Sequence, residues 1–302
     1  KEAIYSAGLF RKALGSQTAA VKNYNAFIKS YPDDTRVNGL KIERADTFET
    51  AGKHSEAAKL YQGFYTSPEG KSADEVFYAK LHYGLALEAM GQNGKAKTHW
   101  LKMVSDYEAA KAAGVEMEAA TEFTARVMLK LARPQLDRAL GLKIDGPKTK
   151  VSGKKEGEIL KAQLLAKAKA VQEVEASYLK IIKTGAGEYG LASLVDLGKL
   201  YENLAETLRT SYVPPTLTEE QKEYYRDTLE DKAYPNEEKA VQAYSQALGK
   251  SYSLNLYNDN TAYAVRRLGI LRPADQPGLE EDILTPRFTS KSVVESTFEP
   301  AL

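Results

Sequence analysis

The chain has 302 residues, a formal net charge of +1 at pH 7 and no cysteine. A net charge this close to zero gives no overall field that would attract nucleic acid or an anionic membrane, and the lack of cysteine excludes disulfides and thiolate metal sites. No apolar run approaches the roughly 20 residues that a transmembrane helix needs. Abundant Ala, Leu, Lys and Glu favour helix.

One frame of four residues recurs three times in residues 1–107. A glycine, an alanine, an aromatic residue and a large apolar residue follow one another at intervals of five, four and three residues. The copies are Gly15, Ala20, Tyr24 and Phe27, then Gly52, Ala57, Tyr61 and Phe64, then Gly91, Ala96, Trp100 and Met103. Glycine can adopt the left-handed conformation that closes a helix. Because alanine lets a facing helix approach and the aromatic ring fills the gap, the frame predicts three helical hairpins.

The first helix of each predicted hairpin carries a small residue at a matching place, namely Gly8, Ala45 and Gly84. With the frame, this pattern resembles the tetratricopeptide repeat, which has a small residue in its first helix and A-x3-F in its second. The copies lie 37 and then 39 residues apart, more than the roughly 34 of the simple repeat. The resemblance implies an all-α solenoid of stacked helical hairpins with a concave side.

A long apolar stripe follows between Ala109 and Leu140. It predicts a helix that covers the third hairpin, because a solenoid needs its end capped. Pro134 lies inside the stripe and predicts a kink or break, since proline has no N–H to donate to the preceding turn. Residues 1–141 are therefore expected to form an N-terminal unit of repeats with a covering helix.

Residues 142–157 differ in composition, with glycine, proline, serine and several lysines but no apolar period. This composition predicts a Lys-rich linker or exposed loop. Lys148, Lys150, Lys154 and Lys155 would also suit phosphate or anionic lipid, but no aromatic residue lies among them and acidic residues follow closely. A solvated loop is the favoured interpretation.

Helical repeats are expected to resume over 158–272. The best first-helix signature of the chain lies here and consists of Leu194, Leu197, Gly198 and Tyr201. A matching second helix comes late in the sequence and carries Ala240, Tyr244 and Ala247. The delay predicts a repeat with an insertion at 211–236.

The insertion begins with Pro214 and Pro215, which require an extended backbone. A short helix is expected to follow Thr218 as its N-cap, with Gln221 completing a capping box, and to stop at Pro235. Residues 273–302 contain several prolines with many serines and threonines, and this composition predicts an extended, irregular tail.

Residues 212–273 also resemble envelope tetratricopeptide proteins associated with gliding motility in myxobacteria and related predatory bacteria. The resemblance is carried by SYVPPTLTEEQKEYYRDTLEDKAYPNEEKAVQAYSQAL and by LNLYNDNTAYAVRRLGILRP. It implies a component of a periplasmic or outer-membrane-associated assembly, although the absence of cysteine suits the cytoplasm equally well. The chain begins at Lys1 rather than Met, which leaves a cleaved leader open.

The sequence offers no constellation for catalysis. It has no G-x-S-x-G nucleophile motif and no glycine-rich phosphate loop between a strand and a helix. The histidines are His54, His82 and His99, and no two are one helical turn apart, as a zinc site on one helix would need. We expect no catalytic residue, no metal, no cofactor and no enzymatic activity. A pair formed by His82 and His99 across the third hairpin is the weaker alternative.

The repeat resemblance places a partner-binding groove on the first helices of the hairpins. The residues expected to line it are Tyr5, Leu9, Lys12, Ile42, Asp46, Glu49, Tyr78, Leu81, Leu85 and Glu88. Family members that clamp a C-terminal carboxylate use Lys, Arg and Asn at such places, and that set is largely missing here. An apolar, partly aromatic groove suits an amphipathic helix or an extended apolar peptide, unless the chain's own helices or C-terminal tail fill it.

A second candidate surface lies in the insertion, where Tyr212, Tyr224 and Tyr225 combine an apolar face with a polar tip. Together these features predict a non-catalytic scaffold or adaptor in a bacterial envelope assembly such as gliding machinery, with a protein or peptide partner and no nucleic acid. The alternatives are a periplasmic chaperone-like peptide binder and, less favoured, an enzyme or small-ligand-binding protein with a closed pocket near residue 150. Neither the partner nor the oligomeric state follows from the sequence.

Overall fold

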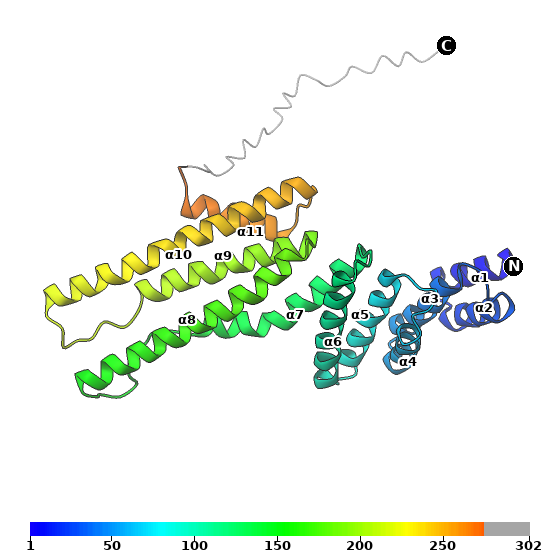
Figure 1. Ribbon diagram of the computed structural model, residues 1–302, viewed down its shortest axis with the longest axis horizontal. Helices are drawn as coiled ribbons and strands as arrows, with labels where there is room; N and C mark the ends of the chain where they lie inside the picture. Colours follow the sequence, from blue (N-terminus) through cyan, green and yellow to red (C-terminus); the bar gives the residue numbers. More distant parts are fainter. Residues whose placement is uncertain (275–302) are drawn as a thin grey trace, which may run out of the picture.

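The computed structural model describes residues 1–274, which fold into eleven α-helices. They are α1 (Glu2–Ala13), α2 (Gln17–Ser30), α3 (Val37–Thr50), α4 (His54–Tyr65), α5 (Ala73–Ala89), α6 (Asn93–Ala112), α7 (Ala119–Gly141), α8 (Gly153–Lys183), α9 (Gly187–Arg209), α10 (Glu219–Leu254) and α11 (Asp259–Leu271). They stack into an elongated superhelix with α1 at one end (Figure 1). The expected all-α solenoid is confirmed, while the tail predicted at 273–302 lies outside the described residues from position 275 on. None of the helices described is both long and apolar enough to cross a membrane.

The glycines of the repeated frame close the turns inside the first three hairpins. Gly15, Gly52 and Gly91 have φ angles of 75°, 71° and 72°, in the left-handed region that glycine enters without steric cost. They join α1 to α2, α3 to α4 and α5 to α6. The three predicted hairpins are therefore confirmed.

A small residue of the first helix lies directly against an aromatic ring of the second. A Cβ atom added to Gly8 would lie 2.7 Å from Cε1 of Tyr24, and one added to Gly84 would lie 2.0 Å from Nε1 of Trp100. Both distances are far shorter than van der Waals contact, so the close-packed interface has room only for glycine.

The same contact recurs between α9 and α10. A Cβ atom on Gly198 would lie 2.4 Å from Cε1 of Tyr244, which is fully buried. The predicted late repeat is therefore present, with α9 as its first helix and the C-terminal part of α10 as its second.

The insertion is organised differently from the prediction, because α10 continues through Pro235 as one helix of 36 residues. Thr218 and Gln221 do form the expected capping box. The helix continues past the proline because it packs on α9 on both sides, through the fully buried Ala233 and Ala240. Arg209 of α9 donates to Glu230 (2.8 Å) and to Glu237 (2.5 Å), one on each side of Pro235. The packing and these ion pairs together offset the backbone hydrogen bond that proline removes.

The helix predicted over 109–140 is also corrected. α6 continues to Ala112, Gly114 follows it with a φ of 73°, and α7 begins only at Ala119. Pro134 does not break α7. Buried side chains on both sides of it, including Val127 and Leu136, hold the helix against its neighbours.

α7 pairs with α8 in addition to covering the third hairpin. Val127 packs into a cluster with α5 and α6, and Leu136 packs into another with α8 and α9. Residues 142–152 of the predicted linker therefore form the loop of a further hairpin. The rest of that segment belongs to α8, which begins at Gly153. The backbone N–H of Tyr212 donates to the carbonyl of Ile144 (2.8 Å) and ties this loop to the α9 to α10 connection.

The apolar core is divided along the superhelix. The first hairpin has a small cluster around Tyr24, Phe27 and Leu40, whereas α7 to α11 share one large cluster. Each hairpin therefore depends mainly on its immediate neighbours, as in other solenoids.

A buried lysine caps the C-terminal end of α7. Lys167 is fully buried, and its Nζ donates to the carbonyls of Ala139 (2.8 Å) and Leu142 (3.0 Å) and to Oδ1 of Asn203 (2.6 Å). Burial lowers the pKa of Lys167 to about 8, so the ammonium form still predominates at neutral pH. The last carbonyls of a helix have no partner within the helix, and this ammonium supplies one.

Substitution of Gly198 by alanine tests the contact between small residue and ring. We expect Gly198→Ala to lower the free energy of unfolding by about 1–3 kcal/mol, because the new methyl group overlaps Tyr244. Gly249→Ala is the matched control, since Gly249 is also helical and has open space around its Cβ, and it should gain about 0.5–1 kcal/mol. Urea unfolding followed by circular dichroism measures both, and equal stability of the two variants would contradict the packing argument.

Substitution of Lys167 by methionine tests the buried ammonium. Lys167→Met leaves three buried or partly buried acceptors without their donor, and we expect unfolding to cost about 2 kcal/mol less than in the wild type. Lys169→Met, at an exposed lysine of the same helix, should leave the melting temperature nearly unchanged. Similar melting temperatures for the two variants in calorimetry would show that Lys167 is not needed to close α7.

Candidate functional site

The N-terminal part of the predicted groove is accessible. Leu9 is 37% exposed, and Tyr5 is partly buried with the Arg36 guanidinium 4.5 Å from its ring centre. Lys12 of α1 pairs with Glu43 of α3 (2.5 Å), which ties the first helices of two hairpins together. A partner on α1 would therefore meet an apolar surface beside an ion pair.

The far end of the groove is not open in the way that the sequence predicted. Leu81 is only 2% exposed and packs with Trp100 in the core, so its assignment to the groove surface is wrong. Leu85 packs against the same cluster, and Glu88 pairs with Lys130 of α7 (2.7 Å). α7 covers this part of α5, so one of the chain's own helices occupies the place expected for a partner.

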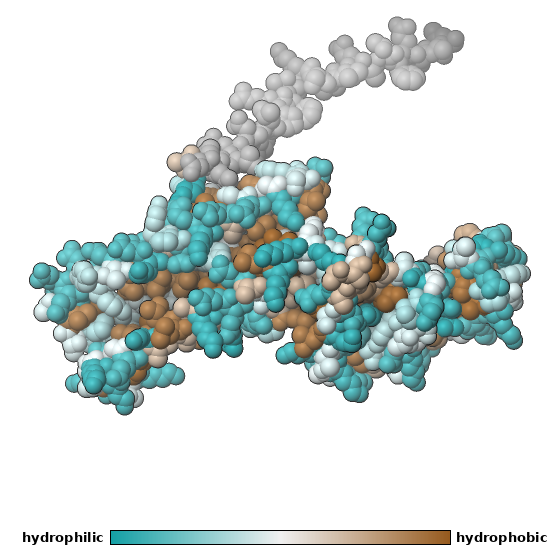
Figure 2. Space-filling model, viewed as in Figure 1, coloured by the Kyte–Doolittle hydropathy of each residue, from teal (hydrophilic) through white to brown (hydrophobic). Residues whose placement is uncertain are grey.

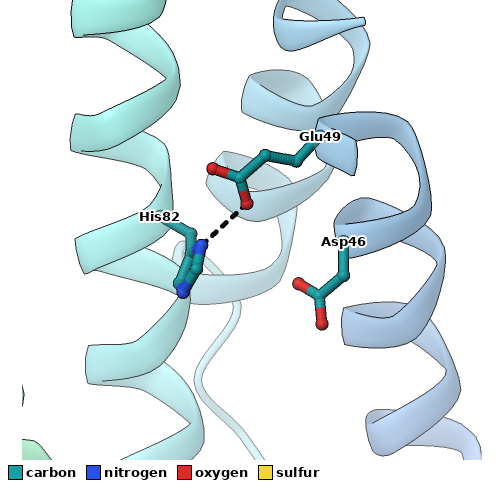
Figure 3. Close-up of side chains that lie close together, drawn as sticks. All are labelled: Asp46, Glu49 and His82. Carbon is teal, nitrogen blue, oxygen red and sulfur yellow. Dashed lines mark hydrogen bonds and ion pairs between the residues drawn. The ribbon is translucent and has the colours of Figure 1, made fainter. Parts of the chain in front are cut away.

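The centre of the groove holds an acidic cluster made of Asp46, Glu49, Tyr61, Tyr78 and His82. Asp46 and Glu49 are three residues apart on α3 and face His82 of α5, whose Nδ1 lies 2.7 Å from Oε2 of Glu49 (Figure 3). The Tyr61 hydroxyl lies 2.6 Å from Oδ1 of Asp46 and 2.7 Å from Oε2 of Glu49. Tyr78 donates to Oδ2 of Asp46 (3.2 Å). Two carboxylates thus share the single proton of Tyr61.

Aromatic contacts fix the orientation of His82. The Tyr78 ring stacks on it with centroids 4.2 Å apart, and the Tyr61 ring lies 5.4 Å away. His99 has different partners, because its Nε2 bonds the carbonyl of Lys80 (2.7 Å). The two histidines therefore serve separate contacts and do not form the pair considered from the sequence.

The pKa values of the two carboxyl groups in the cluster are shifted in opposite directions. Burial raises the pKa of Asp46, and the hydrogen bond from Tyr61 offsets only part of that effect. Burial also opposes ionisation of Glu49, but hydrogen bonds from His82 and Tyr61 outweigh it and lower its pKa. Glu49 is therefore the firmly ionised member, while Asp46 carries its charge at a cost in free energy.

Asp46, Glu49 and His82 offer ligand atoms that all lie within 4.8 Å of one another. Carboxylate and imidazole groups are ligands for divalent metals. The Tyr61 hydroxyl already lies between the two carboxylates, so a cation would have to displace it. That this cluster binds no metal stays a prediction. A lysine or arginine side chain is an alternative cation that the carboxylates could bind.

The insertion tyrosines occupy three different environments. Tyr212 is partly buried, and its hydroxyl donates to Oε1 of Glu156 (2.7 Å), so it serves mainly to hold the chain together. Tyr225 lines a pocket, whereas Tyr224 is 75% exposed. Only Tyr224 has the exposure expected of a surface residue.

No family model and no curated protein matches the sequence. Among solved structures, the chain is similar to a TPR repeats protein from Bacteroides fragilis NCTC 9343, with 14% sequence identity and a TM-score of 0.44. The match covers 89% of this chain and 98% of that chain. A likeness at this level carries no functional argument. None of the three comparisons supports the link to gliding motility.

Neutral substitutions of the two carboxylates should act in opposite directions. At pH 7 we expect Glu49→Gln to lower the free energy of unfolding by about 1 kcal/mol, because it removes an ionised partner of His82 and Tyr61. Asp46→Asn should raise it, because burial opposes the charge of Asp46. Chemical unfolding at several pH values measures both effects.

The contribution of Glu49 to stability should depend on pH. Its folded pKa is depressed, so its contribution is complete above the unfolded value of about 4.5 and is lost as the pH falls through the folded value. The difference between wild type and Glu49→Gln should therefore shrink in acid. A difference that is constant down to low pH would contradict the assigned ionisation.

Proposed function

We propose that this chain is a non-catalytic scaffold that holds a segment of a partner protein along α1, α3 and the start of α5. The observation that carries the proposal is the acidic cluster, which lies partly exposed beside the accessible apolar surface of α1. The side chains of Glu49 and His82 keep 23% and 21% of their exposure. A partner could therefore reach the carboxylates without unfolding the hairpins.

The chemistry of the groove favours a partner segment that is both apolar and basic. Leu9 and Tyr5 offer apolar contact, and the two carboxylates have only three neighbouring donor groups, of which the Tyr61 hydroxyl lies between both. A lysine or arginine of the partner would add charge-assisted hydrogen bonds to these carboxylates. This refines the apolar peptide inferred from the sequence, because the centre of the groove is acidic.

The proposal also includes a cellular location. A place in a periplasmic or outer-membrane-associated assembly, such as gliding machinery, is supported only by the resemblance of residues 212–273. The absence of a recognisable nucleophile motif supports a non-enzymatic role. A chaperone-like peptide binder would use the same groove but would accept many apolar segments.

Affinity capture from the source organism tests the proposal with a matched pair of variants. Leu9→Arg places a positive charge on the accessible α1 surface, and we expect it to reduce recovery of the partner about tenfold, or about 1.4 kcal/mol of binding free energy. Leu101→Arg is the control, because Leu101 is 54% exposed on α6. This helix is the second of its hairpin and does not belong to the predicted groove. Quantitative mass spectrometry of the captured proteins measures recovery.

The pattern of loss separates the alternatives. One defined partner lost with Leu9→Arg and retained with Leu101→Arg supports a scaffold. Loss of many unrelated proteins would favour the chaperone-like binder. Equal recovery by both variants would mean that the partner does not bind in the groove.

A further inference from the structure

A hollow of about 360 Å³ lies between α3, α4 and the loop that joins α4 to α5. Half of the residues that line it are basic, namely Lys41, Arg44, Lys59 and Lys71. The hollow differs in character from the region between α8 and the α9 and α10 pair, where Figure 2 shows hydrophobic side chains gathered. We call it the basic pocket, and its charge indicates an anionic ligand.

No carboxylate lines the basic pocket to balance these charges. Glu43, next to Arg44 in the sequence, pairs with Lys12 (2.5 Å). Glu56 and Glu69 are close in sequence to Lys59 and Lys71, but neither pairs with a basic residue of the pocket within residues 1–274. The four positive charges therefore have no ion-pair partner in the part of the chain that the structure describes.

Neighbouring groups hold two of the cations in place. Nη1 of Arg44 donates to Oδ1 of Asn25 on α2 (2.7 Å). Nζ of Lys71 donates to the carbonyl of Ser67 and lies 4.8 Å from the ring centre of Phe64. Side chains that are already oriented lose less conformational freedom when a ligand binds, so the pocket is partly preorganised.

The position of Arg44 also favours an anion. The residue is partly buried, and burial lowers the pKa of its guanidinium. Arginine nevertheless stays protonated in proteins, and the Asn25 amide that it contacts is neutral. Because a charge held away from water is costly without a counter-ion, an anion in the pocket would stabilise this arrangement.

The number of cations indicates the class of anion. A carboxylate carries one negative charge and two acceptor oxygens. A phosphate group carries a charge close to −2 at neutral pH and three strong acceptor oxygens. Basic side chains from two helices and a loop can approach such a group from several sides, and arginine and lysine are the residues with which proteins bind phosphate.

We propose that the basic pocket binds phosphate or a small phosphate-bearing molecule such as pyrophosphate. The site is separate from the acidic cluster. On α3, about 140° of helix rotation separates the pair Lys41 and Arg44 from the pair Asp46 and Glu49. This proposal and the scaffold function can therefore fail independently.

Calorimetric titration of the full chain with inorganic pyrophosphate at low ionic strength tests the proposal. We expect Lys41→Gln with Lys59→Gln to weaken binding at least about tenfold, because it removes two charge-assisted contacts. Lys95→Gln with Lys97→Gln is the matched control, since both lysines are exposed on α6 and the change in net charge is the same. This control should leave the Kd nearly unchanged.

A steric variant tests the same pocket without changing its charge. Gly63 of α4 lines the pocket and has open space at its Cβ position. We expect Gly63→Leu to weaken pyrophosphate binding about tenfold or more, because the new side chain takes up part of the pocket. Gly249→Leu is the control at another helical glycine with open space, and it should bind like the wild type.

Four results would overturn the proposal. Wild-type protein that does not bind pyrophosphate, or equal weakening by the two lysine pairs, would show that the pocket has no specific affinity. Citrate, a carboxylate anion of similar charge, binding as tightly as pyrophosphate would contradict the assignment to phosphate. Binding to vesicles that contain phosphatidic acid, without competition from pyrophosphate, would assign the pocket to a lipid headgroup instead of a small molecule.

Discussion

The repeated hairpins depend on the close approach of two helices at one small residue. Where Gly8, Gly84 or Gly198 faces an aromatic ring, no side-chain atom separates the backbone of the first helix from that ring. The ring then fills the space that a bulkier residue would need and buries a large apolar area. Because this contact sets three of the hairpins, side chains from the first helices of neighbouring hairpins can meet, as Lys12 does with Glu43 and His82 with Glu49.

The parts of the fold that could be predicted were those fixed by short-range shape. Gly198 and Tyr244 could be matched by spacing and side-chain size despite a long interval between them. The effects of Pro134 and Pro235 could not, because packing on both sides of each proline outweighs one lost hydrogen bond, and such packing comes from distant residues. The hairpin of α7 and α8 lacks the glycine and aromatic frame, so no local sequence pattern predicts it.

The centre of the candidate site was only half predictable. Asp46 and Glu49 were placed on the groove by the repeat resemblance, but their contact with His82 joins residues that are 33 positions apart in the case of Glu49. It arises because α3 and α5 lie alongside each other in consecutive hairpins. Leu81 was misplaced for a related reason. Its position on the helix is right for a groove, yet its side chain turns into the core with Trp100.

The division of the core has a kinetic consequence. The first hairpin is held by a small apolar cluster, so its backbone amides should exchange with solvent through local opening, well before the α7 to α11 region opens. A partner bound across α1 and α3 would stabilise only the closed hairpin and would slow that exchange in proportion to its concentration. The hairpin that offers the groove is thus also the one expected to open most easily, so occupancy of the groove could be measured as protection of its amides from exchange.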